Sequence, residues 1–212
     1  MVKVFLSAGH GGADPGAVAN GLYEKVINLN TLLACKSELE RHGVTVVCSR
    51  TKDENDPVTQ EVKEANASGA DIALSFHINA GGGDGFEAYY YDSSKKGKKL
   101  AGLCEKFIKN LGQNSRGLKS GNKLHFVKST SMPAVLVESF FIDNIKDKTF
   151  GDTIAEQTSL GEAYAKAILE YFDITYKSKK TYRVQVGVYN NKANAEATKK
   201  KLKSAGFEAI IV

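Results

Sequence analysis

The chain has 212 residues, 42% of them hydrophobic, and its 29 Lys or Arg against 24 Asp or Glu give a formal net charge of +5. This length and composition predict a globular protein with one full core and some residues to spare. No stretch is long and apolar enough to span a membrane, and the apolar run 1–7 is too short for a signal peptide. We therefore expect synthesis in the cytoplasm without a signal peptide, and no insertion into a membrane.

The run 1–7 predicts the first strand, and it leads into a glycine-rich loop that carries His10. A helical pattern follows over 22–42, with Glu24 in its first turn. A histidine in a loop is most often an ordinary polar group, and the helix dipole alone favours an acidic residue in a first turn. The same two residue types are also ligands of catalytic zinc, which commonly takes three protein ligands from His and Glu.

A second histidine occupies the corresponding place further along the chain. The run 71–76 predicts a buried strand, His77 follows it at once, and Asn79 comes two residues later. In open α/β sheets, ligands collect outside the carboxyl ends of the strands, so His10 and His77 can converge on one ion. Together with Glu24 they predict a zinc site.

A carboxylate beside this predicted site comes from the run 134–137, which is almost purely apolar and indicates a central strand of a parallel sheet. Glu138 stands at or near the end of that strand. A hydrolytic zinc needs a base that is not itself a ligand. Burial raises a carboxyl pKa and a nearby dication lowers it, so Glu138 is a candidate base near neutral pH. The alternative is an ordinary acidic residue at a strand end.

With these residues in place, the chain resembles the zinc-dependent N-acetylmuramoyl-L-alanine amidases of the Amidase_3 family over roughly residues 2–173. Six separated blocks carry the resemblance in the family's order: 9–17 (GHGGADPGA), Glu24 with Asn28, Ser49-Arg50-Thr51, Ala65-Asn66, 75–80 (SFHINA) and 132–138 (MPAVLVE). One position departs from the pattern, since the family frequently has an arginine where this chain has Glu61. We expect that difference to affect an ion pair on a helix surface and to leave the chemistry intact.

The resemblance implies hydrolysis of the amide bond between N-acetylmuramic acid and L-alanine in bacterial peptidoglycan. It implies that His10, Glu24 and His77 bind Zn²⁺, which polarises the scissile carbonyl and activates water. Glu138 would be the catalytic acid/base, taking a proton from that water and returning it to the departing nitrogen. Asn79 would lie at the rim of the site, where we expect a contact with substrate.

Strand and helix patterns alternate from residue 2 to residue 172, which predicts an α/β fold with a twisted, mostly parallel sheet and helices on both faces. Helices are expected over 22–42, 58–69, 95–112 and 153–173. Strands are expected, after the first, over 44–48, 71–76, 85–91, 123–127 and 134–137.

The three cysteines, Cys35, Cys48 and Cys104, lie within apolar helix or strand patterns, and we expect buried free thiols. A cysteine nucleophile paired with a histidine is the alternative. The context disfavours it, because Cys35 is in mid-helix and Cys104 is on a helix that bears lysines. His125, within the strand predicted over 123–127, stays unassigned.

The pattern changes at 175–181, a polar and basic linker between a catalytic domain predicted over 1–174 and a small unit over 182–212. The small unit has the pattern of a βαβ unit, with a strand over 182–188, a helix over 191–204 and a strand over 206–212. It resembles half of a sporulation-related (SPOR) repeat, which implies binding to peptidoglycan. So small a unit cannot bury a stable core alone. We expect two chains to pair these units in a homodimer, with a tail packed on its own catalytic domain or partly disordered as the alternative.

Charge is divided unevenly along the chain. Residues 175–212 carry nine Lys or Arg and two Glu, a net charge of +7, which leaves about −2 of the chain's +5 on residues 1–174. A basic tail suits the anionic polymers of Gram-positive walls. Nucleic acid is not expected as a partner, because no basic stripe interleaved with aromatic residues is present.

These observations predict a zinc amidase that degrades Gram-positive cell walls. It would reach the wall after the cell lyses or after the protein is released from the cell. A phage endolysin and an autolysin used at sporulation are both compatible, and the small size with a half-repeat tail favours the endolysin. Two alternatives belong to other classes. One is a non-catalytic protein that binds peptidoglycan, and the other is a zinc hydrolase of the same fold that acts on another amide.

Overall fold

The computed structural model describes residues 1–179 and 184–211, and it divides into two units, Met1–Lys177 and Ser178–Val212. Each unit is described by itself. Within the described residues, no helix combines the length and the apolar composition that a membrane span requires.

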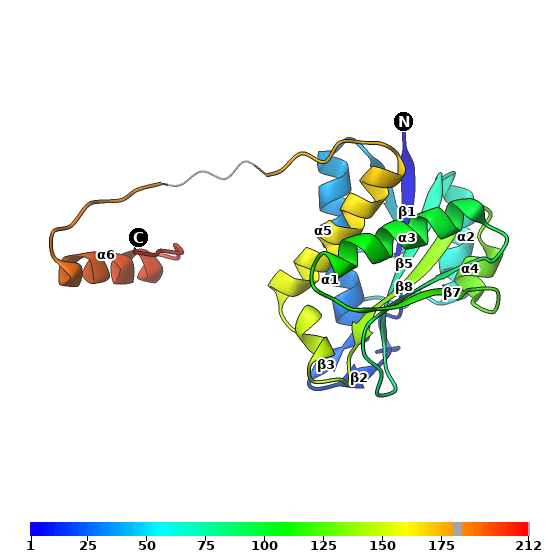
Figure 1. Ribbon diagram of the computed structural model, residues 1–212, viewed down its shortest axis with the longest axis horizontal. Helices are drawn as coiled ribbons and strands as arrows, with labels where there is room; N and C mark the ends of the chain where they lie inside the picture. Colours follow the sequence, from blue (N-terminus) through cyan, green and yellow to red (C-terminus); the bar gives the residue numbers. More distant parts are fainter. Residues whose placement is uncertain (180–183, 212) are drawn as a thin grey trace. The chain divides into compact units, whose positions relative to one another are not determined.

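The first unit is built on a six-stranded sheet whose strands lie in the order β4-β1-β5-β8-β6-β7 (Figure 1). Four of the five strand pairs are parallel, and the exception is β6, which runs antiparallel to β8. The predicted twisted, mostly parallel sheet is therefore confirmed. The strands are β1 (Lys3–Ala8), β4 (Thr45–Cys48), β5 (Ile72–Asn79), β6 (Phe86–Tyr90), β7 (Ser115–Ser120) and β8 (Ala134–Phe141).

Helices cover both faces of this sheet, as predicted. Alternate residues of β1 show why, because Val4 and Leu6 enter one apolar cluster with α1, α3 and α5, whereas Phe5 enters another with α2 and α4. Local signals begin some of these helices. Thr153, for example, accepts a hydrogen bond from the backbone N–H of Glu156 at the start of α5. The helices are α1 (Glu24–Arg41), α2 (Val58–Ser68), α3 (Lys95–Lys109), α4 (His125–Ser129) and α5 (Ile154–Tyr171), with a 3₁₀ turn at Asp147–Phe150.

Several segments of this unit differ from the prediction. The strands expected over 71–76 and 134–137 continue to Asn79 and Phe141, so His77 and Glu138 lie within β5 and β8 and not at their ends. The strand expected over 123–127 is wrong, since α4 (His125–Ser129) forms there and the strand beside β6 is β7 (Ser115–Ser120). A short apolar run such as 123–127 fits a helix as well as a strand. In β7, Gly117, with φ +87°, and several polar residues interrupt the pattern typical of a strand. His125 is exposed on α4. A small hairpin of β2 (Val18–Ala19) and β3 (Leu22–Tyr23) also precedes α1, which therefore begins at Glu24.

The described residues of the second unit contain one helix, α6 (Lys192–Ser204), which confirms the helix expected over 191–204 to within a residue. The described parts of the two expected flanking strands, 184–188 and 206–211, form no strand. Among the described residues of this unit there is no strand with which these segments could pair, and a strand is stable only when its backbone groups are paired. Tyr182, Arg183 and Val212 of those two strands, and residues 180–181 of the predicted linker, lie outside the described residues.

Candidate metal centre

His10 stands in the loop after β1 with a backbone conformation that few side chains adopt, since its φ is +65°. Reciprocal backbone hydrogen bonds between Gly11 and Asp14 close the turn, at 2.9 and 3.1 Å. The Asp14 carboxylate also lies 2.8 Å from His10 Nδ1. This contact fixes the imidazole, so Nε2 faces the interior of the site.

Glu24 begins α1 and is 4% exposed. Its carboxylate accepts hydrogen bonds from the backbone N–H groups of Ala17 at 2.8 Å and Ile78 at 3.0 Å, and from the side chain of Asn28 at 3.4 Å. Burial raises the pKa of Glu24, but its hydrogen bonds to the two histidines outweigh burial and hold that pKa well below its usual range.

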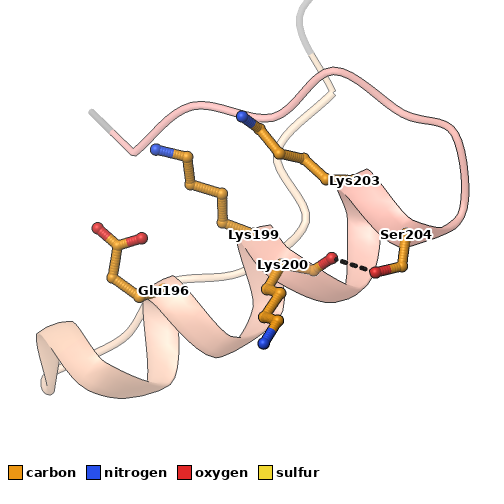
Figure 2. A pocket seen from close by; sticks show the side chains of 5 residues that line it. All are labelled: Glu196, Lys199, Lys200, Lys203 and Ser204. Carbon is orange, nitrogen blue, oxygen red and sulfur yellow. Dashed lines mark hydrogen bonds between the residues drawn. The ribbon is translucent and has the colours of Figure 1, made fainter.

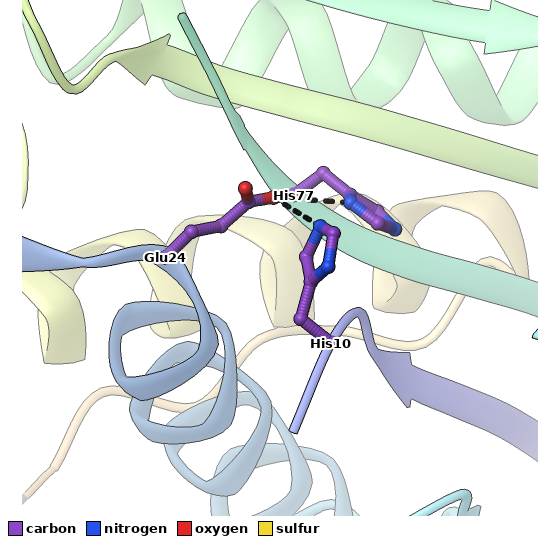
Figure 3. Close-up of side chains that lie close together, drawn as sticks. All are labelled: His10, Glu24 and His77. Atoms are coloured by element: carbon purple, nitrogen blue, oxygen red, sulfur yellow. Dashed lines mark hydrogen bonds and ion pairs between the residues drawn. The ribbon is translucent and has the colours of Figure 1, made fainter. Parts of the chain in front are cut away.

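The rings of His10 and His77 converge on this one carboxylate (Figure 3). Oε1 of Glu24 lies 3.2 Å from His10 Nε2 and 3.1 Å from His77 Nδ1. Burial lowers the pKa of His77, but Glu24 and the charge of Glu138 raise it overall. The hydrogen bond to Glu24 raises the pKa of His10 to about 9. The Glu24 carboxylate therefore strongly favours a positive charge beside it, whether a proton on the histidines or a bound cation carries that charge.

Close backbone approach makes room for the second ring. Gly9 lies directly against His77, and a Cβ on Gly9 would stand 2.1 Å from His77 Cε1. Arg50 stabilises the same stretch, because its buried guanidinium donates to the backbone carbonyls of Ala8 at 2.9 Å and Lys25 at 2.8 Å. The loop before His10 and the helix turn after Glu24 are thus tied to one side chain.

The three side chains fit a bound metal ion. One donor atom each from His10, Glu24 and His77 lies within 4.8 Å of the other two, and this is the one such group in the part of the chain that the structure describes. Two nitrogens and one oxygen are a donor set that zinc takes at catalytic sites with an open fourth position. The structure thus brings together the three residues that the sequence predicts as ligands.

Glu138 lies beside this group on β8. It pairs with His77 of β5 on one side and with Glu87 of β6 on the other. Its Oε2 atom is buried and has no hydrogen-bond partner among the described residues. Burial, with smaller contributions from the charges of Glu24 and Glu87, raises the pKa of Glu138 to about 7. A carboxyl group in this state can both accept and release a proton near neutral pH.

Asn79, predicted at the rim, ends β5 and is half-buried. Its side-chain N–H donates to Glu87 Oε2 at 3.2 Å, and its Oδ1 accepts from the backbone of Ala80 at 2.9 Å. The substrate contact that we expect of Asn79 stays a prediction.

The expected position of Glu61 on a helix surface is wrong, and the expectation that the departure leaves the chemistry intact stays a prediction. This residue is not on a helix surface, because it is 3% exposed on the side of α2 that packs against the sheet. Burial raises the pKa of its carboxyl, and the Ser7 hydroxyl and the charge of His77 partly offset that effect. The departure from the family's pattern therefore lies close to the metal centre.

Sequence reasoning assigned no role to four residues that shape the site. Asp14 and Asn28 were part of the matching blocks, and their spacing of four residues from His10 and Glu24 is a signal that could have been used. Arg50 was also within a matching block. Glu87 was visible only as an acidic residue in the middle of an apolar strand pattern.

The prediction of buried free thiols is confirmed for Cys35 and Cys104, whereas Cys48 is free but only half-buried. Burial raises the pKa of each thiol, that of Cys48 to about 11, so none is a ready nucleophile.

In the second unit, α6 carries a cluster of lysines around a shallow hollow (Figure 2). Ser204 at the end of this helix donates to the backbone carbonyl of Lys200 at 3.0 Å. The hollow is lined by Glu196, Lys199, Lys200, Lys203 and Ser204.

The fold and the site together define an α/β protein with a mostly parallel sheet, in which a His-Glu-His group that could hold a metal ion lies beside a glutamate with a buried carboxylate oxygen. Residues 4–170 match the family model of N-acetylmuramoyl-L-alanine amidases, and residues 163–212 match that of the SPOR domain. The chain belongs to the N-acetylmuramoyl-L-alanine amidase family.

Individual relatives agree with this assignment. The chain is 37% identical to N-acetylmuramoyl-L-alanine amidase CwlM of Bacillus licheniformis over all of its own length and 85% of that protein. It is 38% identical to the endolysin of Bacillus phage SPP1 over 82% of its length and 68% of that protein. The solved catalytic domain of CwlV, an N-acetylmuramoyl-L-alanine amidase of Bacillus (Paenibacillus) polymyxa var. colistinus, matches with a TM-score of 0.77 and 32% identity, covering 82% of this chain and all of that one.

Proposed function

We propose that this protein hydrolyses the amide bond between N-acetylmuramic acid and L-alanine in peptidoglycan. One observation carries the proposal. In a chain of this family, a complete His-Glu-His donor group lies one strand away from Glu138, whose buried Oε2 has no partner among the described residues. A protein that used this fold only for binding would have no need to keep so costly a carboxyl group in place.

We further propose that the resident metal is zinc, held by His10, Glu24 and His77. When bound there, zinc supplies Lewis acidity to water and to the scissile carbonyl. The chain's own residues prepare the site. Asp14 fixes the His10 ring at Nδ1, and backbone N–H groups hold both Glu24 oxygens, so the donors are oriented before the metal binds.

Glu138 moves the proton in this proposal. Its carboxylate accepts a proton from the attacking water and delivers it to the departing alanine nitrogen. The raised pKa of about 7 suits both halves of that transfer, and zinc, when bound, lowers it from that value. The burial that raises the pKa also excludes competing water from Oε2.

The test is release of stem peptides from purified Gram-positive peptidoglycan by the zinc-loaded wild type, Glu138→Gln and Glu40→Gln. Glu40 is an exposed residue of α1 and serves as the matched control. We expect the wild type and the control to produce a new L-alanine amino terminus, and Glu138→Gln to lose activity by about 10²–10⁴-fold. A chelator should abolish activity and zinc should restore it.

Other results would select a different function. Sedimentation with the wall without any new amino terminus would favour a non-catalytic binding protein. Cleavage of soluble peptides in preference to muropeptides would favour a zinc hydrolase that acts on another amide.

We also propose that the tail binds Gram-positive peptidoglycan and that two chains pair through it. Exposed apolar side chains in the segments before and after α6 support this, since Val184 is 85% exposed and Ile210 is 78% exposed. The lysines of α6 favour an anionic wall as the surface bound. Light scattering after size exclusion tests the pairing, because a 22.9 kDa species at all concentrations would contradict it.

We propose a site of action at the cell wall, reached after lysis or release from the cytoplasm in which the chain is made. Fractionation of expressing cells, before and after lysis of the membrane, tests this. Activity on the wall of intact cells in the absence of any lytic partner would argue against it.

A further inference from the structure

A row of charged side chains extends from the metal centre across four adjacent strands. His77 of β5, Glu138 of β8 and Glu87 of β6 are directly paired neighbours, so their side chains emerge on one face of the sheet. Arg116 of β7 continues the row, because its Nε donates to Glu87 Oε1 at 2.6 Å. The row therefore begins at the metal ligands and ends on a cation.

Glu87 is buried, at 5% exposed, yet its pKa is lowered, which favours the ionised form. Burial raises its pKa, but hydrogen bonds from the Tyr89 hydroxyl at 2.6 Å and from Arg116 outweigh burial and lower that pKa overall. Asn79 donates to the same carboxylate at 3.2 Å. Glu87 is thus an anion with three donors, which fixes the position of each of them.

The Arg116 side chain is only partly used by this contact. It is 44% exposed and meets Glu87 through Nε, and no hydrogen bond joins its two Nη atoms to another group in residues 1–179 or 184–211. Its guanidinium carbon lies 5.2 Å from the centre of the Phe141 ring, which supports the planar group from one side. Lys119 is on β7, like Arg116, and is 40% exposed. Its Nζ atom lies 3.8 Å from Glu87 Oε1. Arg116 and Lys119 share the buried Glu87, and the charge of Asp84 also acts on Arg116, so an exposed guanidinium whose two Nη atoms are uncommitted within the described residues lies on the row that leads to the site.

The spacing of this cation from Glu138 matches the substrate. Two strand spacings separate β8 from β7, about 10 Å. In a peptidoglycan stem peptide, a D-glutamyl residue follows L-alanine and is linked through its side-chain carboxyl, which leaves its α-carboxylate free. That group lies two residues from the scissile nitrogen, about 7 Å in an extended chain. The length of an arginine side chain covers the difference.

We propose that Arg116, positioned by Glu87 and assisted by Lys119, binds the α-carboxylate of the second residue of the stem peptide. This inference rests on the proposed function and adds to it a preference for stems with a free carboxylate over stems amidated at that position. The guanidinium fork matches a carboxylate in two parallel hydrogen bonds, whereas an amide offers one acceptor and places an N–H against the other donor.

The experiment compares two soluble muropeptides that differ only in a free α-carboxylate or a carboxamide on the D-glutamyl residue. The zinc-loaded full chain is assayed as wild type, Arg116→Gln, Arg116→Lys and Lys96→Gln. Lys96 is an exposed cation on the first turn of α3, beyond the opposite end of β6, and is the matched control.

We expect the wild type and the Lys96→Gln control to prefer the carboxylate by about tenfold or more in kcat/KM, mainly through KM. Arg116→Gln should reduce that preference to about twofold by losing activity on the carboxylate form alone. Arg116→Lys keeps the charge beside Glu87 and loses the fork, so it should retain part of the preference. This second variant keeps the test decisive if Arg116→Gln folds poorly.

Two results would overturn the inference while the proposed function stands. One is equal cleavage of both muropeptides by the wild type. The other is an equal loss on both by Arg116→Gln, which would make the ion pair with Glu87 a link between β6 and β7 and nothing more. If the wild type releases no new alanine amino terminus from either muropeptide, the proposed function fails and this inference fails with it.

Discussion

Replacing Glu138 with glutamine should stabilise the metal-free protein at the same time as it abolishes activity. The pKa of Glu138 is raised to about 7 in the folded chain, from an ordinary value of 4.5. Between those two pH values the unfolded chain gives up the proton while the folded chain keeps it. The free energy of unfolding therefore falls as pH rises from about 4.5 to 7, and the loss is complete above 7.

The magnitude follows from the size of the shift. At about 1.4 kcal/mol per pH unit, ionisation of Glu138 costs the folded state about 3 kcal/mol above pH 7. Glutamine removes this charge and keeps the shape, so Glu138→Gln should gain about 2–3 kcal/mol at pH 8 and almost nothing at pH 4.5. Zinc should reduce the gain, because a dication near Glu138 lowers the pKa of its carboxyl.

Urea unfolding of the full chain with a chelator present, at pH 4.5 and pH 8, measures both values. Glu40→Gln, at an exposed position on α1, should change the free energy of unfolding by less than about 1 kcal/mol at either pH. Equal or lower stability of Glu138→Gln at pH 8 would refute the reasoning. A gain of the same size at both pH values would also refute it, since the effect would then come from packing and not from charge.

Three further predictions concern the surroundings of the site. Gly9→Ala should abolish zinc binding, measured by calorimetry, because the added Cβ would stand 2.1 Å from the His77 ring; normal affinity would show that the loop can move aside. Asp14→Asn should weaken zinc binding by about 10–100-fold, since it removes the anion that holds His10 Nδ1, and an unchanged affinity in the same titration would contradict this. Tyr176→Ala should lower the free energy of unfolding by about 1–2 kcal/mol in chemical denaturation, because this ring packs at the C-terminal end of α1; no change would mean that the segment contributes nothing to the first unit.

The parts of the fold that could be predicted are those in which local pattern and tertiary position agree. β1 and β5 could be predicted because each contains a long apolar run. His10 and His77 follow those runs, and they come together because the two strands are parallel neighbours, although β5 continues past His77 to Asn79. The long helices are visible for the same reason, and their observed ends differ from the expected ones by only a few residues.

The parts that were missed depend on contacts between distant segments. The polar strand β7 is stabilised by its pairing with β6, so nothing in residues 115–120 alone indicates a strand. Glu61 is on the inward side of α2 because that side meets the sheet, and an acidic residue gives no sign of burial in a sequence. The two strands expected around α6 are absent from 184–188 and 206–211 for the opposite reason, since an alternating local pattern finds no partner strand among the described residues of its unit.

Glu87 shows why the electrostatics of the site could be predicted only in part. The sequence predicts Glu138 at or near a strand end, whereas the residue lies inside β8, and its raised pKa also depends on a second glutamate that the sheet register places directly opposite. Two ionised glutamates side by side would repel, and Tyr89, Arg116 and Asn79 prevent this by stabilising the charge on Glu87 alone. The pair is therefore asymmetric. The Glu87 carboxyl has a lowered pKa and anchors the cation at the end of the row, whereas Oε2 of Glu138 has no hydrogen-bond partner among the described residues and its carboxyl can exchange a proton near neutral pH.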